Sequence, residues 1–201
     1  MTTRDLRLLY WASYEGVLFD GREVIHPARF PGMRDRTVTI GDVWAEQRMI
    51  AWRVAWVIAP GDLVNDISRV SIYNGLVPSG FNQVGARVAL QEPPGDLAAA
   101  NAEWQRRRDE TLRQLEVLPA VPAAGGWSLL VDTRALGVEP ADLSARLLEQ
   151  KVAATPMGGW GGEVAARHLR FVFSNEPVER LTVLGERMRA ALRSAAYSTA
   201  S

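Results

Sequence analysis

Residues 37–62 read TVTIGDVWAEQRMIAWRVAWVIAPGD, and this stretch decides the fold because two predicted strands lie within it. Polar and apolar residues alternate over residues 37–43, which is the pattern of a strand with one buried face. Residues 53–59 are a mostly apolar run of strand length that ends at a proline and a glycine. The stretch therefore predicts two neighbouring strands of a sheet.

Helices are predicted on both sides of the second strand. A short helical turn is expected over residues 43–50, and Asp42 is a candidate N-cap for it. Asp62 is in position to cap a further helix that begins at about Leu63. Alternating strands and helices indicate an α/β fold.

Segments outside this stretch continue the alternation. Residues 6–12 (LRLLYWA) predict a buried strand, and residues 83–91 and 97–118 predict helices. Two oppositely charged pairs at four-residue spacing support the longer helix: Glu103 with Arg107, and Asp109 with Arg113. This helix is expected to link two lobes of the chain.

A turn-rich segment marks the boundary between these lobes. Residues 119–126 (PAVPAAGG) are rich in proline and glycine, so we predict one domain over residues 1–118 and another over 119–201. The second is expected to contain strands at 127–132, near 152–155 and at 168–174, and a helix at 141–151. A final helix follows a cap at Asn175 to Pro177, with an apolar stripe of Leu181, Leu184, Met188 and Leu192.

Composition excludes several classes of protein. The 201 residues are 47% hydrophobic and 23% charged, which is enough apolar content to bury a core. The formal net charge is zero, so there is no electrostatic basis for a nucleic-acid or anionic-membrane partner. Apolar runs such as residues 54–60 are too short to span a bilayer, and the N-terminus lacks a signal-peptide pattern, so a cytoplasmic location is expected.

Scarce residue types limit the chemistry. The chain has no cysteine and only two histidines, so neither a thiolate site nor a histidine-rich metal site is expected. His26 is expected in a loop before a proline, and His168 at the edge of a strand. Lys151 is the only lysine, and an imine with a carbonyl cofactor would therefore need Lys151 or the α-amino group.

Four stretches together resemble a known family. They are YEGVLFDG at 14–21, FPGMRDRTVTIG at 30–41, EQRMIAWRVAWVIAP at 46–60 and HLRFVFSNEP at 168–177. In this order they are similar to the C-terminal half of the class I/II pyridoxal-phosphate aminotransferases of fold type I. The resemblance implies an α/β fold: part of the family's large cofactor-binding domain, with three strands and their helices, over residues 1–118, and its small C-terminal α/β lobe over residues 119–201.

The resemblance also implies three site residues. Tyr14 corresponds to the tyrosine that binds the phenolic oxygen of the cofactor, and Arg53 to the arginine that binds its phosphate. Arg170 corresponds to the arginine that binds the substrate carboxylate. These residue types suit those roles, because a guanidinium donates parallel hydrogen bonds to phosphate and carboxylate, and a phenol stabilises an oxyanion.

Three positions depart from the family pattern. Ala45 stands in place of the Schiff-base lysine, Asp42 in place of a serine of the phosphate site, and Trp11 in place of the aspartate that pairs with the pyridinium nitrogen. Alanine cannot hold the cofactor or move a proton, tryptophan cannot keep the ring protonated, and the carboxylate of Asp42 would repel a phosphate. Small residues usual for the family are also enlarged near three positions: Trp44, Ala51 and Ala55.

Structural roles remain open for the same residues. Without the resemblance, Arg53 and Arg170 would be assigned to ion pairs and Tyr14 to packing. Trp11 and Trp44 are expected to fill the core, in the space that the cofactor vacates. The glycine-rich residues 158–162 (GGWGG) lack the lysine and hydroxyl of a phosphate loop.

Two functions remain open. The first is a non-catalytic, aminotransferase-like pseudoenzyme or fragment, with no cofactor, that associates with a partner or binds a small molecule. The second is an enzyme with altered chemistry, natural or engineered, in which Asp42 acts as a base in the refilled cofactor pocket. A sheet without the family's other strands keeps an unpaired edge, so we expect a homo-oligomer, a partner chain that supplies the missing N-terminal half, or a repacked fold.

Overall fold

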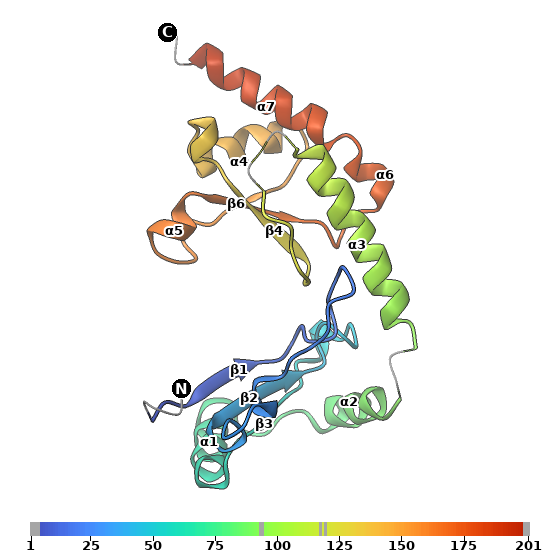
Figure 1. The fold of residues 1–201 in the computed structure, drawn as a ribbon, viewed down its shortest axis with the longest axis vertical. Helices are drawn as coiled ribbons and strands as arrows, with labels where there is room; N and C mark the ends of the chain where they lie inside the picture. The colour runs from blue at the N-terminus through green and yellow to red at the C-terminus, as the bar shows by residue number, and fades with distance from the viewer. Residues whose placement is uncertain (1–4, 93–94, 117, 119, 199–201) are drawn as a thin grey trace. The chain divides into compact units, whose positions relative to one another are not determined.

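The computed structural model describes residues 5–92, 95–116, 118 and 120–198, and the chain separates into two compact units, Met1–Ala99 and Ala100–Ser201. Each unit contains one small sheet with helices (Figure 1). The α/β class predicted from the sequence is confirmed.

The first unit is built on a sheet in the order β1–β2–β3. β1 (Leu8–Trp11) runs parallel to β2 (Thr37–Asp42), and β3 (Ala55–Ile58) runs antiparallel to β2. Burial alternates along β2, as the sequence predicts for a strand with one buried face. Within the described part of the chain, β1 and β3 each have a single strand neighbour, so both are edges of this sheet.

Two helices follow this sheet, α1 (Gly61–Gly75) and α2 (Gly80–Gln91). Both are described in full, and Ala86 is their only buried residue. Several of their large apolar side chains are more than half exposed: Val70, Ile72, Tyr73, Phe81 and Val84. The buried apolar residues of this unit come mainly from its loops: Val17, Phe19, Met33 and Val43.

Both helix-capping predictions for this unit are wrong. Asp62 does not cap α1, because the helix begins at Gly61 and the carboxylate of Asp62 binds the guanidinium of Arg7 at 2.8 Å. Residues 43–47 form bends instead of a helical turn, and the next helical segment is the 3₁₀ turn η3 (Ile50–Trp52). In each case the carboxylate has partners that are distant in sequence, which a local capping rule does not consider.

The second unit has an antiparallel sheet in the order β4–β6–β5. Its strands are β4 (Ser128–Asp132), β5 (Thr155–Pro156) and β6 (His168–Val172). Helices α4 (Pro140–Glu149) and α7 (Leu184–Ser198) pack together over one face of this sheet (Figure 1). Between these layers lies a core of side chains that are at most 1% exposed: Val131, Leu143, Leu147, Leu169, Met188 and Ala191.

Helix α3 (Leu97–Gln114) starts at the end of the first unit and packs along the second. Arg107 donates to the backbone carbonyl of Ser174 at 2.5 Å, and the buried Arg108 donates to the carbonyl of Ala123 at 2.8 Å. These bonds attach α3 to the second unit. The division between the units therefore lies at residues 99 and 100, before the turn-rich segment at 119–126.

The charge pairs of α3 are partly as predicted. Glu103 pairs with Arg107 at four-residue spacing, as expected. Arg113 binds Glu110 at three-residue spacing instead of Asp109. Both spacings place side chains on one face of a helix, so the sequence alone does not choose between them.

The predicted final helix is two helices, α6 (Val178–Leu181) and α7. Leu181 and Leu184, on either side of the break, are both buried, as the apolar stripe predicts, while Leu192 is half buried. Short helical segments complete the chain: η1 (Pro27–Arg29), η2 (Arg34–Arg36), η4 (Arg134–Leu136) and α5 (Glu163–Ala166).

Candidate functional site

A half-buried carboxylate lies at the ends of β1 and β2 in the first unit. Because these strands are parallel neighbours, the residues at their carboxyl ends meet at one edge of the sheet. Asp42 accepts hydrogen bonds from the hydroxyl of Ser13 (2.8 Å), the backbone N–H of Trp44 (2.8 Å) and the indole N–H of Trp11 (3.0 Å). Asp42 therefore holds together the segments that follow the two strands.

Trp44 links this carboxylate to Arg53. Its indole packs edge-to-face against Trp11, with 5.9 Å between ring centroids, and the guanidinium carbon of Arg53 lies 4.6 Å from the centroid of the Trp44 ring. Arg53 has a left-handed backbone (φ 56°) where η3 ends, a conformation that costs a non-glycine residue roughly 1–3 kcal/mol. We call Trp11, Ser13, Asp42, Trp44 and Arg53 the Trp–Asp cluster.

The Trp–Asp cluster is open to solvent. Trp11 is 58% exposed, so the prediction that it fills the core is wrong. Trp44 is half buried and likewise lies outside the core. The physical reason is that β1 is an edge strand and the indole of Trp11 reaches across the surface to bind Asp42. Arg53 contacts an aromatic ring rather than a carboxylate.

Tyr14 and Ala45 lie in the two loops next to the cluster, and both are half buried. The backbone N–H of Gly16 donates to the carboxylate of Glu46 at 2.6 Å, which holds the loop after β1 against the loop after β2. The structure therefore brings five of the residues singled out in the sequence to one end of this sheet: Trp11, Tyr14, Asp42, Ala45 and Arg53.

Arg170 belongs to the second unit, where its Cα pairs with those of Leu130 on β4 and Thr155 on β5. Its guanidinium carbon lies 5.0 Å from the ring centroid of Trp127 and 4.7 Å from that of Trp160. Its Nε atom is buried and has no hydrogen-bond partner among the described residues. A guanidinium that contacts aromatic rings keeps its positive charge and its N–H donors for an anion.

Neither histidine belongs to these groups. His26 precedes η1, as expected of a loop residue before a proline, and its Nδ1 accepts from the backbone N–H of Ala28 at 3.1 Å. His168 begins β6, and its Nδ1 lies 2.6 Å from the carbonyl oxygen of Val164. In the part of the chain that the structure describes, no group of three His, Cys, Asp or Glu side chains could hold a metal ion, and no helix is long and apolar enough to cross a membrane.

Sequence reasoning missed the surroundings of His26. Its Nε2 lies 3.2 Å from the hydroxyl of Thr39, and its ring packs edge-to-face against Tyr10 at 5.0 Å. Burial, together with the nearby carboxylate of Glu15, raises the pKa of Tyr10 to about 12. The alternation along residues 37–43 places Thr39 on the buried face, but no spacing connects it with the other three residues.

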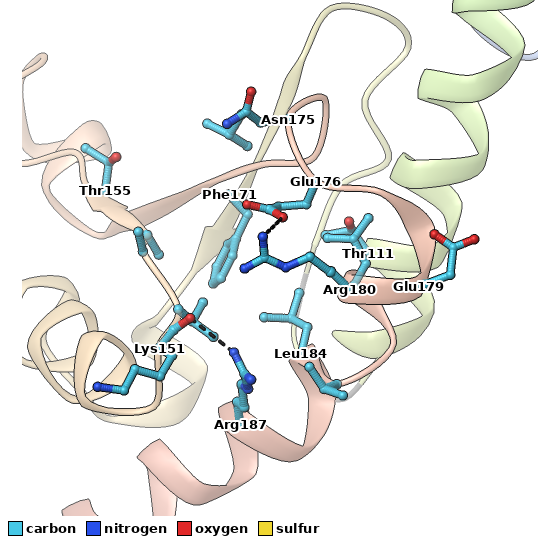
Figure 2. Close-up of a pocket in the computed structure, with 16 residues that line it drawn as sticks. Thr111, Lys151, Thr155, Phe171, Asn175, Glu176, Glu179, Arg180, Leu184 and Arg187 are labelled. Carbon is cyan, nitrogen blue, oxygen red and sulfur yellow. Dashed lines mark hydrogen bonds and ion pairs between the residues drawn. The ribbon is translucent and has the colours of Figure 1, made fainter.

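A pocket of about 570 Å³ in the second unit was also missed (Figure 2). Residues 151–155, Phe171 and the segment around α6 and α7 line it. Arg180 pairs with Glu176 at 3.0 Å, and Arg187 donates to the backbone carbonyl of Lys151 at 3.1 Å. The walls come from segments far apart in sequence, so no local sequence pattern predicts the pocket.

Comparison with known proteins connects these features to a family. An arginine–pyruvate transaminase of Pseudomonas aeruginosa is 32% identical over 179 residues, which cover 87% of this chain and 45% of that protein. An aromatic-amino-acid aminotransferase of Thermococcus litoralis is 27% identical over 194 residues, which cover 94% of this chain and 49% of that protein. No family model matches the chain.

Solved structures point the same way. An aromatic aminotransferase from Pyrococcus horikoshii matches with a TM-score of 0.87 and 26% identity, over 96% of this chain and 53% of that one. An N-succinyldiaminopimelate aminotransferase from Mycobacterium tuberculosis matches with a TM-score of 0.78 and 26% identity, over 94% of this chain and 50% of that one. The chain is therefore a homologue of the pyridoxal-phosphate-dependent aminotransferases of fold type I, and it spans about half the length of the relatives it matches.

Proposed function

We propose that this chain is a non-catalytic, aminotransferase-like protein, a pseudoenzyme or fragment that binds a partner chain or a small molecule. The observation that carries the proposal is the Trp–Asp cluster, in which Trp11, Asp42 and Arg53 correspond by resemblance to positions of the family's cofactor site. Beside it, Ala45 takes the place of the Schiff-base lysine. A methyl group forms no covalent bond to a cofactor and moves no proton, so we expect no transamination by this chain.

The residues of the cluster do not fit pyridoxal phosphate, the cofactor of the family. The carboxylate of Asp42 already accepts the hydroxyl of Ser13 and the N–H groups of Trp44 and Trp11. By resemblance Asp42 stands at a serine position of the phosphate site, so its negative charge would repel the phosphate. We therefore assign no step of a cofactor reaction to this chain.

Arg170 supports the ligand-binding part of the proposal. It corresponds by resemblance to the family's carboxylate-binding arginine, and its Nε has no hydrogen-bond partner within the described ranges. We assign residues 119–201 to the family's small C-terminal lobe and residues 1–118 to a remnant of its large domain. Arg170 and position 45 then belong to different lobes. Arg170 can therefore bind a carboxylate although position 45 has no amine.

Exposed apolar surface on the first unit supports the association part. Leu9 on β1 is 69% exposed, Ile58 on β3 is 64% exposed, and Phe81 on α2 is 91% exposed. Edge strands with apolar side chains are templates for pairing with another chain. Since the relatives are about twice as long as the segment they share with this chain, a partner that supplies the other half, or a second copy of this chain, would cover this surface.

Altered catalysis by Asp42 has less support. A carboxylate offers about four lone-pair sites, and Asp42 already accepts three hydrogen bonds. A general base needs a free lone pair directed at a substrate in an enclosed pocket, whereas the neighbouring Trp11 is 58% exposed. Turnover of a substrate that Asp42→Asn abolishes without unfolding the protein would revive this alternative.

Retention of pyridoxal phosphate tests the proposal directly. The purified protein is incubated with the cofactor and desalted, and its absorbance is recorded with and without borohydride reduction. The wild-type protein is expected to retain no chromophore. A retained band that borohydride fixes covalently, and that Lys151→Arg removes, would show that Lys151 has replaced the lost lysine and would refute the non-catalytic proposal.

Ala45→Lys is the matched variant for this experiment. If the cluster does not fit the cofactor, restoring the amine alone leaves the protein without a chromophore. If Ala45→Lys retains the cofactor while the wild-type protein does not, the missing lysine explains why the wild-type protein fails to retain it. The inference that Asp42 prevents the cofactor from binding would then be wrong.

A further inference from the structure

We propose that the pocket formed by residues 151–155, Phe171 and the segment around α6 and α7 binds a small amphipathic monocarboxylate, such as a medium-chain fatty acid. Among the described residues, those that line the pocket do not include Arg170 or the two tryptophans that its guanidinium contacts, Trp127 and Trp160. The pocket is therefore a second site, separate from the one at Arg170.

The floor of the pocket is apolar and tightly packed. Phe171, Leu181 and Leu184 all line it and are only 4%, 7% and 6% exposed. Its volume of about 570 Å³ lies within the range of roughly 300–1,000 Å³ that is typical of small-molecule sites. An acyl chain or an aromatic ring would cover this floor, and the removal of apolar surface from water would drive binding.

The pocket carries a positive charge that no carboxylate balances. Arg180 and Glu176 form an ion pair at 3.0 Å and neutralise each other. Arg187 donates instead to a neutral group, the backbone carbonyl of Lys151, and no carboxylate of the described residues pairs with it. Figure 2 shows Arg187 reaching toward the pocket from α7, while the carboxylate of Glu179 and the amine of Lys151 point away from it. One cation above an apolar floor complements a monoanion with an apolar body.

An extended peptide fits less well than a small molecule. β5 is an edge strand, so an added strand would pair with its outer edge. The N–H of Met157 bonds to the carbonyl of His168 on β6, so Ala154 and Pro156 face outward by the two-residue alternation. Proline has no N–H, and the carbonyl of Ala154 already accepts from the hydroxyl of Ser144 at 2.7 Å.

Isothermal titration of the whole chain with octanoate tests the proposal. Octanol, which lacks the charge, and acetate, which lacks the chain, are the comparison probes, and each is expected to bind at least about tenfold more weakly than octanoate. Arg187→Gln is expected to weaken octanoate binding by about tenfold or more without changing that of octanol, because it removes one charge-assisted contact. Arg193→Gln changes an exposed arginine of the same helix and is the matched control, with no expected effect.

A variant that fills the pocket distinguishes binding at this site from nonspecific binding of octanoate to the exposed apolar surface of the first unit. Ala153 is an exposed residue of the pocket wall, so Ala153→Phe places a ring in the pocket without disturbing the core, and octanoate binding is expected to be lost. Octanoate affinity that is unchanged in both Ala153→Phe and Arg187→Gln would overturn the proposal. Absence of octanoate binding to the folded wild-type protein would also overturn the proposal. This holds whether sedimentation shows the protein to be a monomer or an oligomer.

Discussion

The two units bury their apolar residues to very different extents. In the second, α4 and α7 close over the sheet, and Leu143, Leu147 and Met188 are at most 1% exposed. In the first, α1 has no buried residue and α2 contributes only Ala86. Exposed apolar patches of this kind are typical of interaction sites and ligand-binding grooves. The difference teaches that the second unit has a core of its own, whereas the helices of the first unit leave most of their apolar side chains exposed.

Truncation of one apolar side chain in each unit should give the largest contrast. Leu147→Ala removes a fully buried side chain from α4 and should lower the free energy of unfolding by about 2–5 kcal/mol. Val64→Ala in α1, where the side chain is 46% exposed, should change it by no more than about 0.5 kcal/mol. Denaturant unfolding followed by circular dichroism measures both. Equal losses would mean that α1 is packed as well as α4, and the comparison would fail.

A glycine substitution in the sheet of the first unit should have the next largest effect. A Cβ atom at Gly41 would lie 2.4 Å from the ring of Trp56, so Gly41→Ala should cost about 1–3 kcal/mol of stability. A Cβ atom at Gly80, at the start of α2, meets no atom within 4 Å, and Gly80→Ala should be neutral or stabilise by about 0.4–1 kcal/mol. Thermal unfolding of both variants measures this difference. A loss of stability for Gly41→Ala alone would show that the sheet is tightly packed, and equal effects would show that it is not.

Removal of the charge from the Trp–Asp cluster should have a smaller effect. Asp42→Asn keeps one acceptor oxygen but places an amide near the indole N–H of Trp11, so we expect a loss of about 1–2 kcal/mol and a change in tryptophan fluorescence. Asp66→Asn changes an exposed carboxylate of α1 and should cost less than about 0.5 kcal/mol. If the two variants behave alike, the cluster does not hold the loops together.

The smallest effect is expected at high pH. Burial raises the pKa of Tyr10 from 10.0 to about 12, so the folded state keeps this proton at a pH where the unfolded state has lost it. The contribution of Tyr10 to stability is fully present below pH 10 and is lost as the pH rises through about 12. Tyrosinate absorbance of the wild-type protein and of Tyr10→Phe assigns the titration. Ionisation of Tyr10 near pH 10 would show that β1 is less well covered than the structure indicates.

Local patterns were sufficient for much of the fold. The alternation over residues 37–43 predicted β2, and the apolar stripe placed Leu181, Leu184 and Met188 in the core. These predictions succeeded because, in a strand or helix with one buried face, apolar residues recur in the sequence at the side-chain period of that element. The resemblance of four stretches to aminotransferases anticipated the homologues and the structural matches.

Other predictions failed where a distant residue decided the outcome. Asp62 was expected to cap a helix, but Arg7 takes its carboxylate. Trp11 was expected in the core, but Asp42 holds its indole at the surface. The pocket beside Arg187 could not be predicted either, because the residues that line it come together only when α6 and α7 fold back onto the sheet.

The hydrogen bonds of Asp42 also bear on what a change back to the family's residues, as the resemblance gives them, would do at positions 42 and 45. Asp42→Ser would replace the two carboxylate oxygens that accept from Trp11 and Trp44 with one neutral hydroxyl on a shorter side chain, so this change is expected to cost stability. A lysine introduced at position 45 is expected to be attracted to the carboxylate of Asp42 and held as an ion pair instead of a free amine. Under the proposed function, each of these single changes is thus unfavourable without the other, and the site would need both together to bind the cofactor.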